Sequence, residues 1–229
     1  MLAVLLALVA ALAAYAGRRA HRLEAALTEA RLEARLAALA MQLRPHFLLN
    51  ALNTAAELAY RDAPTADRVL TALGQLLRHS LRHDGARDVP LRDELALLRS
   101  YVDVERARFG DCLAIEWAIA PETMAARVPP LLLQPLVENA VRHGIGPRET
   151  AGVVRIVATR ERDALCLVVA DDGVGFGQSV PVPPHGLGLA NVRARLHALY
   201  GARHGFEIAS GVDRGTVVRV RLPWVLVSR

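Results

Sequence analysis

Three short stretches decide the fold of this chain: residues 138–144 read ENAVRHG, residues 171–175 read DDGVG, and residues 186–189 read GLGL. The second stretch ends an apolar run typical of a strand, and the third precedes a run with helical spacing. Glycine has no Cβ, so both glycine pairs allow the backbone to approach a ligand closely or to adopt positive φ. Together the three stretches predict one nucleotide pocket, with the phosphates at the start of the last helix, where free N–H groups favour anions.

The polar residues of this pocket suit adenine and a magnesium-bound phosphate chain. Asp171 ends an apolar strand, where its carboxylate accepts a hydrogen bond from the adenine amine, whereas guanine presents an acceptor there. An unpaired buried acceptor costs about 1–3 kcal/mol, so adenine is expected to be preferred. Asn139 offers an amide oxygen that suits Mg²⁺ held mainly by phosphates and water. A plain hairpin turn is the alternative for residues 171–175 taken alone.

Arg142 and His143 lie about one turn after Asn139 on the same predicted helix. Both side chains are expected to hold the phosphates of ATP. A solvated helix face is the alternative explanation for this pair of residues.

The amino-acid composition argues against nucleic acid as a direct partner and against a metal site made of cysteines. The net charge of +5 comes from arginine alone, since the sequence contains no lysine, and only 4% of residues are aromatic. Arginines scattered among carboxylates do not form a basic stacking surface, so no direct nucleic-acid partner is expected. Cys112 and Cys166 lie in apolar runs without metal-ligand spacing and are expected to be reduced core residues of strands.

Residues 2–17 carry no charge and consist almost entirely of Leu, Ala and Val. At about 1.5 Å per residue this stretch is just long enough to span a hydrocarbon layer of about 30 Å. Arg18, Arg19 and Arg22 follow it, which places the remainder in the cytoplasm. We predict a single membrane helix over 1–17, in the cell (inner) membrane, without an extracytoplasmic domain in this chain. A cleaved signal peptide and a buried soluble helix are the alternatives.

The residues after this segment predict paired helices. From 23 to 41 apolar positions alternate in steps of four and three, which indicates a coiled coil, with a single amphipathic helix as the alternative. A helix after Pro45 and a second helix after the turn at 62–65 form an antiparallel pair. Doubling this pair through the coiled coil predicts a four-helix dimerisation bundle. A third helix from about 91 to 109 ends at Gly110.

Beyond residue 111 the pattern changes to that of a separate α+β domain. Strands rich in Val and Ile alternate with helices, and the alternation in 218–222 predicts a mixed sheet covered on one face only. The predicted strands are 113–119, 153–159, 164–170 and 215–222, and the predicted helices are 131–143 and 189–200.

These motifs resemble a known family. Asn139 with its helix, the turn at 171–175 and the loop at 186–189 resemble the ATP-binding fold shared by histidine kinases, gyrase, Hsp90 and MutL. Residues 43–53, LRPHFLLNALN, and 133–144, LQPLVENAVRHG, resemble boxes of the LytS-like sensor histidine kinases. The resemblance covers about 43–223 and implies a two-layer α/β sandwich of the GHKL (Bergerat) type. Four boxes in order are far more specific than one Gly-x-Gly.

The resemblance also implies catalytic roles. His46 is the expected phosphoacceptor, which attacks phosphorus as a neutral imidazole, rather than a capping or core histidine. Phe47 stands where many histidine kinases place an acid, so Glu138 is the candidate base, with a structural role as its alternative. Asn50 is the candidate for positioning a water in dephosphorylation of the partner. The expected nucleotide contacts are Asn139, Arg142, His143, Asp171, Gly173, Gly175, Gly186, Leu187, Gly188, Leu189 and Thr216, the last because it matches a family threonine near adenine.

The predicted organisation has four parts. They are a transmembrane helix (1–17), a coiled-coil linker (18–43), a dimerisation and histidine phosphoacceptor domain (44–110) and a GHKL ATP-binding kinase domain (111–229). The expected function is that of a membrane-anchored, homodimeric, ATP- and Mg²⁺-dependent protein histidine kinase. Its phosphoryl group is expected to pass to an aspartate of a response regulator, of the LytTR type by resemblance. The alternatives are an ATP-gated dimeric interaction module without phosphotransfer and a gyrase-like or MutL-like ATPase.

Overall fold

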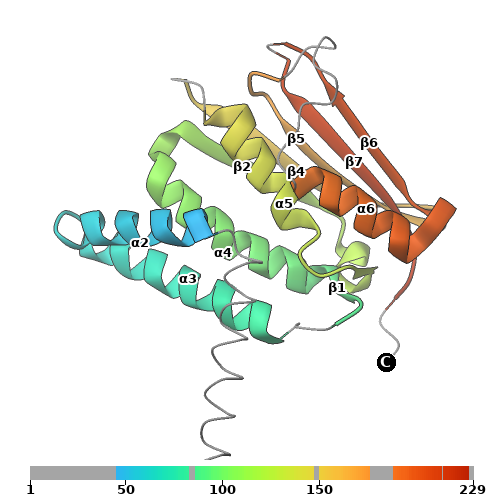
Figure 1. Ribbon diagram of the computed structural model, residues 1–229, viewed down its shortest axis with the longest axis horizontal. Helices are drawn as coiled ribbons and strands as arrows, with labels where there is room; N and C mark the ends of the chain where they lie inside the picture. The colour runs from blue at the N-terminus through green and yellow to red at the C-terminus, as the bar shows by residue number, and fades with distance from the viewer. Residues whose placement is uncertain (1–44, 83–85, 147–149, 176–187, 213, 227–229) are drawn as a thin grey trace, which may run out of the picture. The chain divides into compact units, whose positions relative to one another are not determined.

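The computed structural model of the chain describes residues 45–82, 86–146, 150–175, 188–212 and 214–226 (Figure 1). Its contacts divide the chain into two units, Met1–Leu49 and Asn50–Arg229. Only residues 45–49 of the first unit are described, and they open helix α2. The predicted membrane helix and coiled coil lie outside the described residues. Within the described ranges, no helix has both the length and the apolar composition needed to cross a membrane.

A helical hairpin and a third helix precede the sheet. Helix α2 spans Pro45–Ala59 and helix α3 spans Ala63–Arg82. The Asp62 carboxylate accepts hydrogen bonds from the backbone N–H of Thr65 (3.1 Å) and from its hydroxyl, which caps the start of α3 as an acidic cap does. Helix α4, Leu91–Phe109, packs against α3 and ends at a glycine with φ of +58°, as the sequence predicts.

The central sheet has five strands in the order β2-β4-β5-β7-β6. Strand β2 runs parallel to β4 and every other neighbouring pair is antiparallel, so the predicted mixed sheet is confirmed. Burial alternates along β7, as expected for a sheet with unequal faces. The strands are β2 (Leu113–Ile119), β4 (Gly152–Glu161), β5 (Ala164–Asp171), β6 (Gly205–Ser210) and β7 (Thr216–Pro223).

Helices α5 (Leu133–Asn139) and α6 (Gly188–Tyr200) contact each other beside the sheet (Figure 1). Helix α5 continues directly into a π-helical turn, η3 (Ala140–Ile145). The small strands β1 (Val89–Pro90) and β3 (Arg127–Val128) form a separate antiparallel pair. Short 3₁₀ turns cover Gly110–Cys112, Pro121–Ala125 and Gly201–Arg203.

The structure bears on two further predictions, the burial of the cysteines and the domain boundary at residue 110. Cys166 is buried in β5 as expected, but the prediction for Cys112 is wrong, because this residue is exposed in a 3₁₀ turn before β2. The helix that ends at Phe109 contacts α5 and β2 as well as α3. The predicted domain boundary at residue 110 therefore follows a helix that touches both sides of it, and the boundary stays a prediction.

Candidate nucleotide-binding site

Asp171 lies at the end of β5, directly opposite Thr216 of β7. Its Oδ1 accepts hydrogen bonds from the backbone N–H of Gly173 (3.0 Å) and of Thr216 (3.2 Å). The residue is only 8% exposed, and burial raises the pKa of its carboxyl while the two hydrogen bonds oppose that rise. Both of these donors bond Oδ1, and no hydrogen bond to Oδ2 is seen among the described residues.

Three glycines allow close packing around Asp171 and the residues beside it. A Cβ on Gly144 would overlap the Asp171 side chain, and a Cβ on Gly173 would overlap the Gly144 backbone. The backbone N–H of Val174 donates to the Gly144 carbonyl at 3.2 Å. A Cβ on Gly215, which has a φ of +72°, would overlap the Asp171 carbonyl. These glycines are therefore required by the close approach of η3 and β7 to the end of β5.

Gly175 adopts a positive φ, one of the two properties expected of the pocket glycines. Its φ is +58°, and a Cβ there would overlap the carbonyl of Gly211. Such a conformation is rarely adopted by residues with a side chain. Gly175 therefore lies directly against the backbone of the loop between β6 and β7.

Two hydroxyl groups extend the site across the next strands. The Thr216 side chain is buried, and its Oγ1 lies 3.0 Å from Oγ of Ser210, which is its partner in the register of β6 and β7. The Ser210 hydroxyl also donates to the Gly215 carbonyl at 3.0 Å. Thr216, a predicted contact, is thus beside Asp171. Sequence reasoning missed Ser210, because a single serine followed by Gly211 looks like an ordinary turn in the sequence.

The helix that carries Asn139 changes geometry at this residue. Asn139 is the last residue of α5, and in the following π turn the Gly146 N–H donates to the carbonyl of Val141, five residues back, at 2.8 Å. Single π turns inside helices are frequent at functional sites. Here the turn leaves Arg142 and His143 exposed and buries Gly144 against Asp171. Gly144 belongs to the motif over 138–144, but the sequence alone predicted no role for it.

Glu138 is half-buried on α5 and faces α4. Burial, with the negative charge of Glu138 as a further contribution, raises the pKa of Glu105, whereas Arg108, Tyr101 and Arg142 lower it. Glu138 thus belongs to a charged cluster between α4 and α5. Its role as a base remains a prediction.

Of the remaining predicted site residues, the structure describes some and leaves others outside its described ranges. Gly188 and Leu189 open α6, and the Leu189 side chain is buried, so it offers a ligand only its backbone. Gly186 and Leu187 lie outside the described residues. His46 belongs to the first turn of α2 and its side chain lies outside the described residues, while Asn50, one turn later, is half-buried.

The donor set fits a magnesium ion carried in by phosphates. Within the described ranges, no group of three or more His, Cys, Asp or Glu side chains is placed to hold a metal ion. Asn139, at the end of α5, offers one amide oxygen, and Gly144 of the following π turn lies against Asp171. Mg²⁺ typically keeps several waters and takes one or two protein ligands beside phosphate oxygens, which this arrangement allows.

Comparisons with known proteins agree with this geometry. Residues 34–113 match the family model described as "Histidine kinase", and residues 129–226 match "Histidine kinase-, DNA gyrase B-, and HSP90-like ATPase". The chain thus combines a histidine kinase region with a GHKL-type ATPase domain. The α+β fold with a mixed sheet fits that class.

Named relatives narrow the class. The chain is 36% identical over 186 residues to sensor histidine kinase BtsS of Escherichia coli (strain K12) and 34% identical over 198 residues to sensor protein LytS of Bacillus subtilis (strain 168). Both matches cover 81% of this chain and 33% of the relative, so the chain spans about a third of the length of these curated relatives. A solved histidine kinase domain from Erythrobacter litoralis EL346 aligns at 22% identity with a TM-score of 0.49, covering 74% of this chain and 80% of that one. The chain belongs to the LytS-like sensor histidine kinases.

Proposed function

We propose that this chain is an ATP-dependent protein histidine kinase that phosphorylates His46 and passes the phosphoryl group to an aspartate of a response regulator. The observation that carries this proposal is the buried Asp171 carboxylate, whose Oδ1 is held by Gly173 and Thr216 while Oδ2 lacks a donor among the described residues. An acceptor held in this way suits the adenine amine.

The opposite end of the pocket suits phosphates and magnesium. We assign the amide oxygen of Asn139 to Mg²⁺, and Arg142 and His143, both exposed on η3, to phosphate oxygens. The free N–H groups at the start of α6, from Gly188, are assigned to the same phosphates. Bound Mg²⁺ supplies charge neutralisation for phosphoryl transfer.

A nitrogen of the neutral His46 imidazole attacks the γ-phosphorus, so that a P–N bond forms as the bond to the leaving ADP breaks. The imidazole proton leaves to a base, for which Glu138 is the candidate. The phosphoryl group then passes to an aspartate oxygen of the regulator, which restores the imidazole. Asn50 is assigned to a separate step, in which it positions a water that hydrolyses the aspartyl phosphate of the regulator and releases inorganic phosphate.

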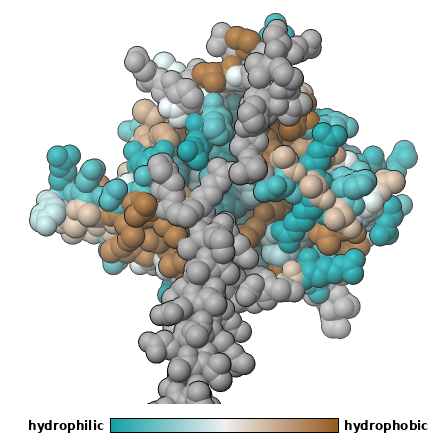
Figure 2. Space-filling model, viewed as in Figure 1, coloured by the Kyte–Doolittle hydropathy of each residue, from teal (hydrophilic) through white to brown (hydrophobic). Residues whose placement is uncertain are grey.

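Exposed apolar side chains on the helical hairpin support a homodimer. Leu52 of α2 is 48% exposed and Leu70 of α3 is 50% exposed. Figure 2 shows hydrophobic surface over the region of these helices. Exposed apolar patches of this kind commonly mark protein interfaces. We therefore propose that a second copy of the chain covers them, as in the predicted four-helix bundle.

The location and the partner complete the proposal. The uncharged stretch over 2–17 followed by arginines supports an anchor in the inner membrane with the catalytic part in the cytoplasm. The LytS-like family supports a response regulator of the LytTR type. The alternative function, an ATP-gated dimeric module without phosphotransfer, uses the same pocket and differs only in the fate of the γ-phosphate.

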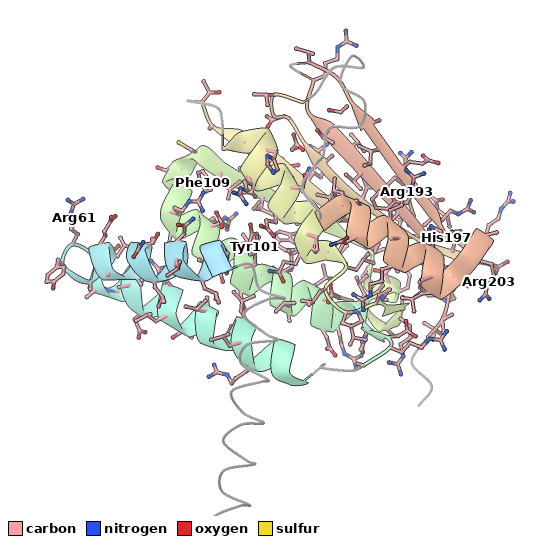
Figure 3. All side chains as sticks on the ribbon, viewed as in Figure 1. Arg61, Tyr101, Phe109, Arg193, His197 and Arg203 are labelled. Carbon is pink, nitrogen blue, oxygen red and sulfur yellow. The ribbon has the colours of Figure 1, made fainter. Side chains whose placement is uncertain are left out.

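One labelling experiment tests the proposal. The full chain is incubated with Mg²⁺ and γ-labelled ATP, and label that is lost in acid and kept in base is expected on the wild type and absent in His46→Gln. His197→Gln changes an exposed histidine of α6 (Figure 3) and should leave the label unchanged. Label that survives His46→Gln would move the acceptor elsewhere. ATP that binds to the chain without transferring its γ-phosphate would favour the ATP-gated module.

A further inference from the structure

A buried carboxylate of α4 holds the start of the helix that carries Asn139. Glu94 is 1% exposed and lies in the first turn of α4. Its Oε1 accepts a hydrogen bond from the backbone N–H of Leu131, and its Oε2 accepts from Leu132 (2.8 Å) and Leu133 (3.1 Å). One side chain thus takes three consecutive backbone donors that lie 37 to 39 residues away in the sequence.

These donors occupy the point where α5 begins. Leu133 is the first residue of α5, and Leu131 adopts a φ of +56°, which is uncommon for a residue with a side chain. The first N–H groups of a helix have no partner within it, and a negative charge there is favourable. Glu94 therefore satisfies donors that would otherwise be buried without a partner and stabilises the left-handed turn.

A second side chain holds the same turn from α6. Nη1 of Arg195 donates to the carbonyl of Pro130 at 2.6 Å, and the charge of Arg195 also acts on Glu94. The turn over 130–133 is therefore held between α4 and α6, the two helices that flank α5 in Figure 1. Asn139 lies six residues beyond Leu133, about 9 Å along the helix axis at about 1.5 Å per residue.

We propose that Glu94 is a positioning residue for the nucleotide site, because it sets the start of α5 and hence the placement of the Asn139 amide. This inference rests on the proposed function only in assigning Asn139 to Mg²⁺. At the adenine end, Asp171 and Thr216 are paired within the sheet, and Asp171 also contacts Gly144 of η3, eleven residues beyond Leu133. This end is therefore expected to respond less to the helix start than Asn139 does. Loss of Glu94 should therefore weaken the magnesium-dependent part of ATP binding and spare the adenine-dependent part.

Calorimetric titration of the full chain with ATP, in Mg²⁺ and separately in EDTA, tests the proposal on Glu94→Gln. The amide nitrogen of Gln cannot accept a hydrogen bond, so at least one backbone donor loses its partner. The Kd of ATP in Mg²⁺ is expected to rise about 10-fold, as for other residues that orient a metal ligand, whereas the Kd in EDTA changes less than about twofold. Hydrogen exchange at 131–133 should accelerate.

A second variant covers the case in which Glu94→Gln does not fold. Arg195 is exposed, so Arg195→Gln keeps the core and should produce a smaller change in the same direction. Arg203→Gln, beyond the end of α6 (Figure 3), and Asp103→Asn, exposed on α4, are matched controls without an expected effect.

Three outcomes would overturn the inference. They are equal loss of affinity in Mg²⁺ and EDTA, unchanged affinity in both variants, and a wild type whose ATP affinity does not respond to Mg²⁺. These titrations do not involve His46. Wild-type binding without His46 phosphorylation would therefore remove the proposed kinase activity and leave the role of Glu94 intact.

Discussion

Asp171 is a buried carboxylate held in a fixed orientation, and we propose that it selects adenine. Two backbone N–H groups donate to Oδ1, and Gly144 approaches the carboxylate so closely that a Cβ there would overlap it. The carboxylate is thus organised before any ligand arrives. Its selectivity should reside in Oδ2.

Asp171→Asn tests this directly. The N–H groups of Gly173 and Thr216 require an oxygen at the Oδ1 position, so the new amide nitrogen must occupy the Oδ2 position and face the adenine amine donor to donor. Losing a hydrogen bond to a charged group costs about 1.5–3 kcal/mol, which corresponds to roughly 10- to 150-fold weaker ATP binding. Titration with ATP measures this loss of affinity, and Asp163→Asn, which changes an exposed residue, is the control. Unchanged affinity would remove Asp171 from the adenine contact.

Gly144→Ala tests the close approach of η3 to β5. The new Cβ would overlap the Asp171 carboxylate, so the free energy of unfolding should fall by about 1–3 kcal/mol, as for other overpacked sites. Chemical denaturation measures the change. Gly74→Ala, in the middle of α3 with only ordinary contacts around its Cβ, should instead stabilise the chain by about 0.5–1 kcal/mol. Equal effects at both positions would contradict the packing described for Gly144.

At the scale of elements, α4 carries two buried acids: Glu94 at its start, which bonds the start of α5, and Glu105 near its end. Arg108 lies 3.3 Å from Oε2 of Glu105, yet this oxygen has no hydrogen-bond partner among the described residues. Burial raises the pKa of Glu105 above the ordinary value of 4.5. The folded state therefore binds this proton more tightly than the unfolded state.

Glu105→Gln should flatten the pH dependence of stability. Because the folded pKa is raised, the stabilising contribution of Glu105 is complete below its unfolded pKa of about 4.5 and is lost as the pH rises through the folded value. Glutamine does not titrate, so at pH 7 the variant should be as stable as the wild type or more stable by about 1 kcal/mol. Denaturation at pH 4.5 and pH 7 measures this, with Glu116→Gln as the exposed control. A variant that loses stability only at pH 7 would show that the ionised pair is stabilising.

The elements that could be predicted from sequence are those with a local signal. The predicted strand at 113–119 and the helix at 91–109 agree with the structure because alternation, helical spacing and a closing glycine each lie within the element. Strand β6 was missed, since it is a short edge strand in which no residue is fully buried. The two-residue strands β1 and β3 exist only because they pair with each other.

The residues of the candidate site also divide into those with a local sequence signal and those that only the fold brings together. Motifs identify Asp171 and the glycines beside it, because each motif is contiguous. Glu94 carries no such signal, since its three partners lie 37 to 39 residues away and only the fold brings them together. The same holds for Ser210, whose relation to Asp171 passes through Thr216 on the strand between them.

At the scale of the whole molecule, the proposed dimer requires the exposed apolar residues of the hairpin. Leu70→Asp puts a charge on that face of α3, and burying an unpaired charge is costly, so the mass measured by light scattering in detergent should fall from two chains toward one chain of 24.8 kDa. Val212→Asp changes a 64% exposed apolar residue between β6 and β7 and should leave the mass unchanged. A persistent dimer in Leu70→Asp would place the interface elsewhere.

Mapping the phosphate on the chain tests the central claim most directly. After incubation with Mg²⁺ and ATP, the full chain is digested at alkaline pH, which preserves phosphohistidine, and its peptides are analysed by mass spectrometry. We expect phosphate on the peptide that contains His46, and none there in Asp171→Asn at ATP concentrations that saturate only the wild type. Saturated wild type without phosphate at His46, or with phosphate on another residue, would contradict the account.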